Sequence, residues 1–242
     1  MATVRRREVA RRLFAYEFNR STYKIEDGGD KAPVYVLTPT GARCNRVFIV
    51  GALLEKEEAR PDSNFWRIRI SDPTGVFIGF VGRFQPEALE TLLEIEPPEM
   101  IAVVGKVRVF EGETRNFVSI RPEYIAVVDS EVRDYWVYET AKRTLERIER
   151  METNRDDGDV ALAWQVYSPD LDEYRNVVKQ ALLTIREEFE VFEEVKEEKR
   201  EEEDEVVEEE VEEIEDIEDI DEFEEEFEFE EEEWDLSDIL ED

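Results

Sequence analysis

The 242-residue chain contains no histidine and a single cysteine, Cys44. One cysteine cannot form an internal disulfide or a cysteine zinc cluster, and the lack of histidine removes the commonest acid–base catalyst and haem ligand. No segment approaches the roughly 18 apolar residues of a membrane helix, and the basic amino terminus lacks the apolar core of a secretion signal. We therefore expect a cytoplasmic protein, in reducing surroundings, that uses no metal and no cofactor and contacts no membrane.

Acidic residues are concentrated at the carboxyl end. Residues 193–242 carry 32 acidic and three basic side chains, a net charge of 3 − 32 = −29. The whole chain has −35, so residues 1–192 carry −35 + 29 = −6. Blocks of like charge stay solvated, and we predict that 193–242 is a disordered acidic tail. The last residues have the composition of a peptide that docks on a partner protein. The docking residues are Trp234, Leu236, Ile239 and Leu240.

Basic residues form local stripes in the remainder of the chain. The first 26 residues hold seven basic groups and three acids. In the same segment Val9, Leu13, Phe14 and Phe18 follow a nearly helical spacing, which predicts a basic amphipathic helix over 4–18. We assign residues 1–41 to this helix and a lead-in segment.

Residues 42–129 have the pattern of a small barrel. Apolar and polar residues alternate over Phe65–Ser71, Asp72–Gly75 has the composition of a turn, and Gln85–Glu94 has that of a short helix. Three strands, a helix and two strands is the element order of the OB-fold, a five-stranded Greek-key barrel. An SH3-like barrel would lack the helix. The predicted core positions are Trp66, Ile68, Ile70, Ile78, Phe80, Val103, Val107 and Val109.

Residues 130–192 have the spacing of helices. Apolar residues recur every three or four positions over 135–151 and over 171–192, and residues 153–167 connect the two stretches. The first stripe can be buried against the barrel, against the second helix, or against the helices of partner chains. We assign this region to oligomerisation or partner binding. The partner-helix residues are Tyr135, Tyr138, Leu145, Ile148, Val178 and Ile185.

Several short strings, taken in order, resemble the archaeal replication protein A (RPA)-associated proteins. The strings are Glu8–Asn19, Ala32–Tyr35, Thr38–Gly41, Asn45–Phe48, Asp72–Gly75 and Arg121–Glu123. The resemblance covers roughly residues 4–150. It implies an OB-fold subunit of an archaeal RPA-like complex that binds single-stranded DNA in replication, repair and recombination, with an RPA-like large subunit as partner. It also favours pairing of the helices with those of partner chains.

OB-folds usually hold single strands on the outer face of their second and third strands, where basic and aromatic side chains bind phosphates and bases. The candidate DNA-binding residues are Phe65, Arg67, Arg69, Phe77, Arg83, Lys106, Arg108, Phe110 and Arg115. The alternative is an adaptor or assembly factor whose OB-fold binds protein. On the bland account of this face, Phe65 and Phe77 pack against the amino-terminal helix and the arginines only keep the outer face soluble.

The sequence offers no catalytic motif. Asp156–Asp159 suggests a calcium loop, but counting from Asp157 the twelfth position is Ser168, where a bidentate glutamate is required. There is no glycine-rich phosphate loop. We therefore predict that the protein is not an enzyme.

Overall fold

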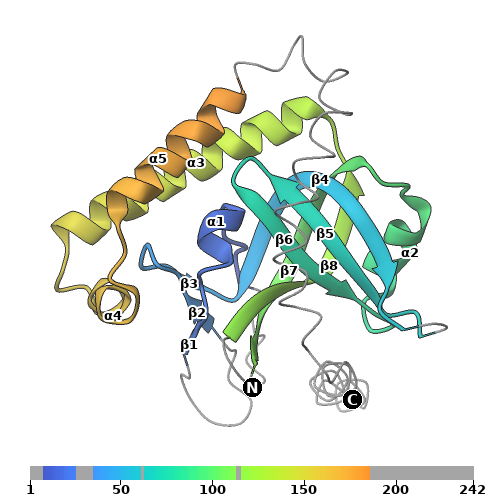
Figure 1. Ribbon diagram of the computed structural model, residues 1–242, viewed down its shortest axis with the longest axis horizontal. Coiled ribbons are helices and arrows are strands. Elements are labelled where there is room, and N and C mark those ends of the chain that lie inside the picture. Colours follow the sequence, from blue (N-terminus) through green and yellow to red (C-terminus); the bar gives the residue numbers. More distant parts are fainter. Residues whose placement is uncertain (1–7, 26–34, 61–62, 113–115, 186–242) are drawn as a thin grey trace, which may run out of the picture. The chain divides into compact units, whose positions relative to one another are not determined.

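The computed structural model describes residues 8–25, 35–60, 63–112 and 116–185, which belong to one compact unit. At its centre five strands close into a barrel in the order β4-β5-β6-β8-β7, and β7 pairs back onto β4 (Figure 1). The barrel strands are β4 (Arg46–Glu58), β5 (Trp66–Asp72), β6 (Gly75–Val81), β7 (Glu99–Glu111) and β8 (Asn116–Val127). Helix α2 (Pro86–Glu94) lies between β6 and β7 in the chain. This is the strand order of an OB-fold.

A short helix, α1 (Ala15–Phe18), packs against β6 on the side of the barrel away from α2 (Figure 1). Leu13, Phe14 and Phe18 are buried in the same apolar cluster as the barrel interior. Of the helix predicted over 4–18, the described residues are helical only over Ala15–Phe18, and residues 8–14 are not helical. Arg11 instead exchanges backbone hydrogen bonds with β4, because its N–H donates to Arg46 O at 2.7 Å and its carbonyl accepts from Phe48 N.

The inward faces of β5 and β6 are set by their hairpin. Asp72 pairs with Gly75 and Ile70 pairs with Phe77, so even-numbered residues of β5 share a face with odd-numbered residues of β6. Ile68 and Ile70 are buried as predicted, but the faces predicted for β6 are reversed. Phe77 is fully buried in the barrel, whereas Ile78 lies on the outer face and is only half-buried. The two-residue loop, rather than the alternation, decides which face is inside.

Two β-bulges shape the outer surface. In β4 the register shifts between Leu53 and Glu55, so that Glu55 and Glu57 face outward opposite Arg69 and Arg67. In the β7–β8 pair the register shifts after Val104 and leaves Glu123 as the extra residue. The first bulge turns Glu55 toward Arg69 of the neighbouring strand β5, and the second leaves Glu123 bound to Arg46 of β4, the strand on the other side of β7.

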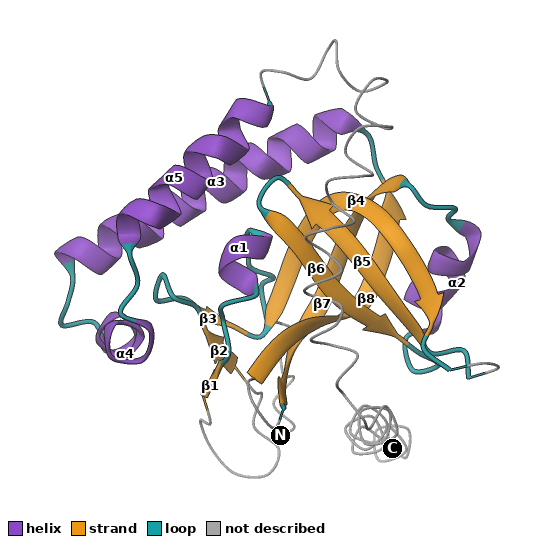
Figure 2. Cartoon of the chain, viewed as in Figure 1, coloured by secondary structure: helices purple, strands orange, loops and turns teal. Residues whose placement is uncertain are grey.

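A second, smaller apolar core lies beside the barrel. It is built by a three-stranded sheet and the ends of three helices. The strands are β1 (Tyr23–Ile25), β2 (Tyr35–Leu37) and β3 (Arg43–Cys44), and the helices are α3 (Ser130–Thr153), α4 (Gly158–Tyr167) and α5 (Leu171–Thr184). Figure 2 shows α3 and α5 side by side along one side of the barrel. Helix α4 was not predicted, because its short apolar sequence was interpreted as a connection.

The C-terminal helices begin where the sequence offers a capping aspartate. Asp129, Asp157 and Asp170 each accept hydrogen bonds from the first-turn N–H groups of α3, α4 and α5, respectively. The prediction of an OB-fold barrel followed by C-terminal helices is confirmed. Within the described ranges, no helix is both long and apolar enough to cross a membrane.

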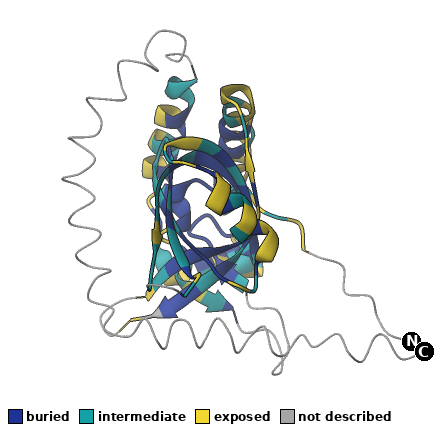
Figure 3. Ribbon diagram, turned by 90° about the vertical axis from the view of Figure 1, so that its right-hand side faces the viewer, coloured by how far each residue is buried: buried dark blue, intermediate teal, exposed yellow. Residues whose placement is uncertain are grey.

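The buried face of α3 is not the predicted apolar stripe, because Tyr135 and Tyr138 are exposed whereas Trp136 is buried. Thr140 and Thr144 are buried, and their hydroxyls donate to the carbonyls of Trp136 and Thr140, so these threonines pack as apolar residues. Trp136 is also buried and donates its indole N–H to Phe48 O at 2.9 Å, which fixes α3 on β4. Figure 3 shows buried residues lining the barrel and exposed residues on the outer sides of the helices.

Candidate nucleic-acid interface

The outer face of β5 is electrically balanced. Arg67 Nη2 lies 2.8 Å from Glu57 Oε2, and Arg69 Nη1 lies 2.9 Å from Glu55 Oε2. Each pair bridges neighbouring strands at directly opposed positions. A phosphate could reach either guanidinium only in competition with the carboxylate already bound to it. The predicted basic stripe of β5 is thus present, but its charge is neutralised by β4.

The aromatic residues predicted to stack on bases are buried. Phe65 packs on Phe80 with ring centroids 5.6 Å apart, and both rings are less than a tenth exposed. Phe110 packs on Phe117 in the same way at 5.2 Å. Phe77 lies inside the barrel. The prediction that Phe65, Phe77 and Phe110 are open stacking platforms is therefore corrected, because protein rings and the core occupy their faces.

The predicted Arg83 is exposed and lies just after β6. Its guanidinium carbon is 4.8 Å from the ring centroid of Phe84, which is half-buried. A cation beside an accessible ring is an arrangement by which single-strand-binding proteins bind unpaired bases. Phe84 was not among the predicted residues, although its position next to Arg83 after Gly82 was the available signal.

The basic residues of β7 lie at a different level of the barrel. Lys106 pairs with Arg46 of β4 and with Arg121 of β8, so three cationic side chains stand in one cross-strand row. Arg46 is bound to Glu123, and the predicted Arg108 follows two residues after Lys106. Lys106 and Arg108 are half-buried. The predicted Arg115 falls outside the described residues.

The two basic regions do not form one groove. Lys106 is opposite Arg46, whereas Arg69 is opposite Glu55, nine positions further along β4. At about 3.3 Å per residue, this separation is roughly 30 Å along the strand. The residues predicted as one DNA-binding surface therefore belong to two surfaces, one near the β5–β6 face and one across β4, β7 and β8.

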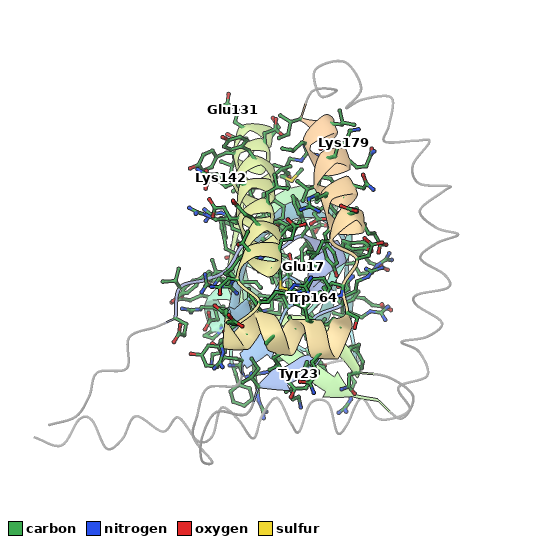
Figure 4. All side chains as sticks on the ribbon, turned by 90° about the vertical axis from the view of Figure 1, so that its left-hand side faces the viewer. Glu17, Tyr23, Glu131, Lys142, Trp164 and Lys179 are labelled. Carbon is green, nitrogen blue, oxygen red and sulfur yellow. The ribbon has the colours of Figure 1, made fainter. Side chains whose placement is uncertain are left out.

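Three of the strings that carry the family resemblance form joints between distant parts of the chain. Glu17 accepts from Arg147 Nη2 at 2.7 Å and from the hydroxyl of Thr40, and it is buried. Arg147 also donates to Thr40 through Nε at 2.7 Å. This network joins α1, the turn after β2 and the middle of α3. Figure 4 places Glu17 between α3 and α5.

Asp72 makes a second joint, between the β5–β6 hairpin and α1. Its carboxylate accepts from Ala15 N at 2.8 Å and from both the N–H and the hydroxyl of Thr74 at 2.7 Å. Burial raises the pKa of Asp72 to about 6, although hydrogen bonds from Ala15, Thr74 and Gly75 act to lower it. Asp72 thus holds the first turn of α1 against the barrel.

The predicted partner-helix residues divide into two sets. Ile148 and Val178 are buried within the chain, and Ile185 is half-buried. Tyr135, Tyr138 and Leu145 are 62%, 54% and 42% exposed on the outer side of α3. Leu145 is therefore not buried by another helix of this chain, and its contact with a helix of a partner chain stays a prediction. Any partner must meet the exposed set, because α5 and the small core already cover the other.

The aspartates after α3 have structural roles. Asp157 caps α4, and Asp159 pairs with Arg43 Nε at 2.7 Å. In the part of the chain that the structure describes, no three His, Cys, Asp or Glu side chains gather in a way that could hold a metal ion. Burial raises the pKa of the Cys44 thiol to about 12, so this cysteine stays protonated and unreactive.

The strand order defines the chain as an OB-fold protein. No protein-family model matches it, and no curated protein matches it. A chain of the Schizosaccharomyces pombe Stn1–Ten1 complex is similar with a TM-score of 0.47 and 10% identity, covering 57% of this chain and 93% of that one. A chain of an RPA heterotrimer bound to single-stranded DNA is similar with a TM-score of 0.41 and 15% identity, and the match covers 58% of this chain and 98% of that one. The second single-stranded-DNA-binding protein of Mycobacterium smegmatis is similar with a TM-score of 0.30 and 14% identity, and the match covers 36% of this chain and 89% of that one. Similarities of this size do not bear on function.

Proposed function

We infer that this chain is a non-catalytic OB-fold subunit of an archaeal RPA-like single-stranded-DNA-binding complex in DNA replication, repair and recombination. The observation that carries this inference is the closed barrel of order β4-β5-β6-β8-β7 with α2 between β6 and β7. Barrels of this order bind single-stranded nucleic acids through the outer face of β5 and β6 and the adjoining loops. Arg83 and Phe84 lie beside that face and supply a cation and a ring.

The partner is an RPA-like large subunit that docks on α3. Tyr135, Tyr138 and Leu145 share the outer side of this helix, whose other side is covered by the chain itself. Amphipathic helices use such apolar stripes to pair with helices of other chains. A further replication or repair protein binds the acidic tail through Trp234, Leu236, Ile239 and Leu240, which lie outside the described residues.

A second candidate function is a protein adaptor or assembly factor whose OB-fold does not touch DNA. The observation that favours it is the pairing of Arg67 with Glu57 and of Arg69 with Glu55, together with the burial of Phe65 and Phe77. A face of balanced charge attracts phosphates weakly, whereas it suits a protein surface of matching charge pattern.

Binding of fluorescently labelled oligothymidylate to the full chain and to residues 1–192 separates the two functions. Direct DNA binding predicts an affinity that falls with salt, at ~0.7 in log–log slope for each phosphate contacted. A titration that stays flat for both proteins at low salt would exclude DNA contact by this chain alone. That result would favour the adaptor, whereas retention of the chain by a purified large subunit is expected for both functions.

A further inference from the structure

A cavity of about 500 Å³ opens where α1 meets the connection between α4 and α5, away from the barrel face considered above. Its volume falls in the range typical of ligand sites. Figure 4 shows this end of the molecule, with Trp164 on α4 and Glu17 between α3 and α5. The site is composed entirely of described residues, and no resemblance or comparison assigns it a role.

Aromatic rings form the walls of this cavity. Tyr16, Tyr167 and Tyr174 line it, with Pro39 and Pro169 between them. Tyr16 and Tyr174 meet edge to face with centroids 5.3 Å apart. The Tyr167 ring is held in place at its hydroxyl, which donates to Leu37 O at 2.7 Å and accepts from Tyr23 N at 2.9 Å. The chain itself therefore holds the Tyr167 ring in place and packs Tyr16 against Tyr174.

The chain already places one guanidinium in this cavity. Arg20 lies over the ring of Tyr16, with its guanidinium carbon 3.6 Å from the ring centroid, and its Nη1 donates to Tyr16 O at 3.0 Å. The contact shows that the ring of Tyr16 accepts a planar cation on one of its faces.

The polar groups of the cavity favour a cation over an anion. Asp170 and Glu173 line it together with Arg20, giving a formal charge of −1. Glu173 accepts the hydroxyl hydrogen of Tyr16, and Asp170 accepts from the N–H groups of Asp172 and Glu173. The two carboxylates would repel a nucleotide phosphate at this place.

Tyr174 gives an independent indication of a ligand. It is 5% exposed and lines the cavity, yet its hydroxyl makes no hydrogen bond to any described residue. The Tyr174 hydroxyl oxygen is not among the described buried side-chain atoms that lack a partner, so it is open to the cavity that the residue lines. Burial raises the pKa of Tyr174, so the hydroxyl stays protonated and its oxygen remains a neutral acceptor. An N–H donor in the cavity would satisfy it.

We propose that this cavity binds an arginine side chain of a partner polypeptide. The guanidinium would stack against the tyrosine rings, donate to the carboxylate of Glu173 and to the hydroxyl oxygen of Tyr174, and lie beside Asp170. An apolar side chain would leave the Tyr174 oxygen without a donor and the carboxylates of Asp170 and Glu173 without a cation from the ligand, and the point charge of lysine would use the ring faces less fully. The site does not depend on DNA binding by the barrel.

The test is an NMR titration of the full chain with N-acetyl-arginine amide, and with N-acetyl-citrulline amide as the neutral isostere. The proposal predicts saturable shifts at Tyr16, Ser168 and Tyr174, and at least about tenfold weaker binding of the citrulline compound. Shifts in the acidic tail are expected from non-specific attraction and do not count. Equal binding of both compounds, or no saturable shift at these three residues, would overturn the proposal.

Two variants locate the site. Glu173→Gln should weaken arginine binding about fivefold, whereas Glu149→Gln, which removes an exposed carboxylate from α3, should leave it unchanged. Tyr174→Phe should weaken binding without lowering the melting temperature, since the lost hydroxyl has no hydrogen bond among the described residues. If Glu173→Gln and Tyr174→Phe both bind as the parent does, the assignment of the cavity is wrong.

Discussion

Glu17 is a buried carboxylate whose partners come from two other parts of the chain, Thr40 and Arg147. Replacing it by glutamine keeps the shape but leaves the guanidinium of Arg147 without its counter-ion in a site where water is scarce. We expect Glu17→Gln to lower the free energy of unfolding by about 3–5 kcal/mol, the usual cost of breaking a buried pair. Urea denaturation of the parent and of Glu17→Gln measures this change in the free energy of unfolding.

The control for this prediction is an exposed ion pair on α3, the helix that carries Arg147. Arg143 and Glu146 lie 2.9 Å apart with both side chains about half exposed. Glu146→Gln should leave the unfolding midpoint unchanged, because solvent screens such a pair. Equal effects of the two substitutions would show that the Glu17 network does not stabilise the fold.

Asp72 predicts a pH dependence of stability. Its ordinary pKa is 3.8 and burial raises it to about 6 in the folded chain. A raised folded pKa stabilises the fold fully below the unfolded value, and this contribution is lost as the pH rises through about 6. Relative to Asp72→Asn, the parent should therefore lose about 1 kcal/mol of stability between about pH 5 and pH 7.5.

Two measurements test the Asp72 prediction. Denaturation of parent and Asp72→Asn at several pH values cancels the contributions of the other carboxylates, and carboxyl NMR follows the titration of Asp72 itself. A titration midpoint below 4, with a constant difference between the two proteins, would show that the hydrogen bonds from Ala15 and Thr74 outweigh burial.

The two basic surfaces make separable predictions for DNA binding. If phosphates lie across β4, β7 and β8, the double substitution of Lys106 and Arg108 to alanine should flatten the salt slope by up to about 1.4, at ~0.7 per contact. Substitution of Arg67 and Arg69 to alanine should then change it little, because Glu57 and Glu55 already neutralise these residues. The reverse result would place the strand on the β5–β6 face.

At the scale of elements, α3 presents two apolar faces with different roles. Ile148 is 1% exposed in the small core, whereas Leu145 is 42% exposed on the outer side. Ile148→Asp should unfold the helical region, because it places a charge in an apolar core. Leu145→Asp should leave the melting temperature unchanged and weaken binding of a partner subunit, measured by analytical ultracentrifugation. Unchanged assembly with Leu145→Asp would leave this face without a docking role.

Several elements could be predicted because their signals are local. Ile68 and Ile70 alternate with arginines, Pro86 opens α2, and Asp170 caps α5, so each of these elements follows from nearby residues. The faces of β6 could not be predicted by alternation, because the length of the Asp72–Gly75 hairpin sets their parity. The β4 bulge likewise turned Glu55 outward with no sign in the sequence pattern.

The candidate site was less predictable than the fold, since it depends on contacts between distant residues. Neither the pairing of Arg69 with Glu55 nor that of Phe65 with Phe80 follows from the position of either residue alone. The spacing of Tyr135, Tyr138 and Leu145 predicted a buried apolar stripe, but the buried face of α3 instead contains Thr140 and Thr144. A threonine whose hydroxyl bonds to a carbonyl of its own helix can be buried like an apolar residue, and the sequence alone does not show which threonines do so.

At the scale of the whole molecule, charge is divided between a nearly neutral body and a tail of 3 − 32 = −29. Residues 193–242 lie outside the described residues, so the prediction that the tail competes with DNA rests on its charge and on its covalent link to the body. A tethered segment has a local concentration near millimolar for a short flexible linker. The closely spaced carboxylates of the tail roughly imitate a phosphate chain, and we expect them to compete with DNA for the basic surface around Lys106.

Removing residues 193–242 should therefore tighten binding of oligothymidylate at low salt. The gain should shrink as salt is added, since screening weakens the contact of the body with the tail and with DNA alike. Removing only 234–242 takes away Trp234 and Leu240 but leaves most of the charge. This shorter deletion should keep the DNA affinity of the full chain and abolish binding of the tail's partner. Equal DNA affinity of the full chain and the long deletion at low salt would exclude competition, whereas the docking role of the last nine residues would still stand.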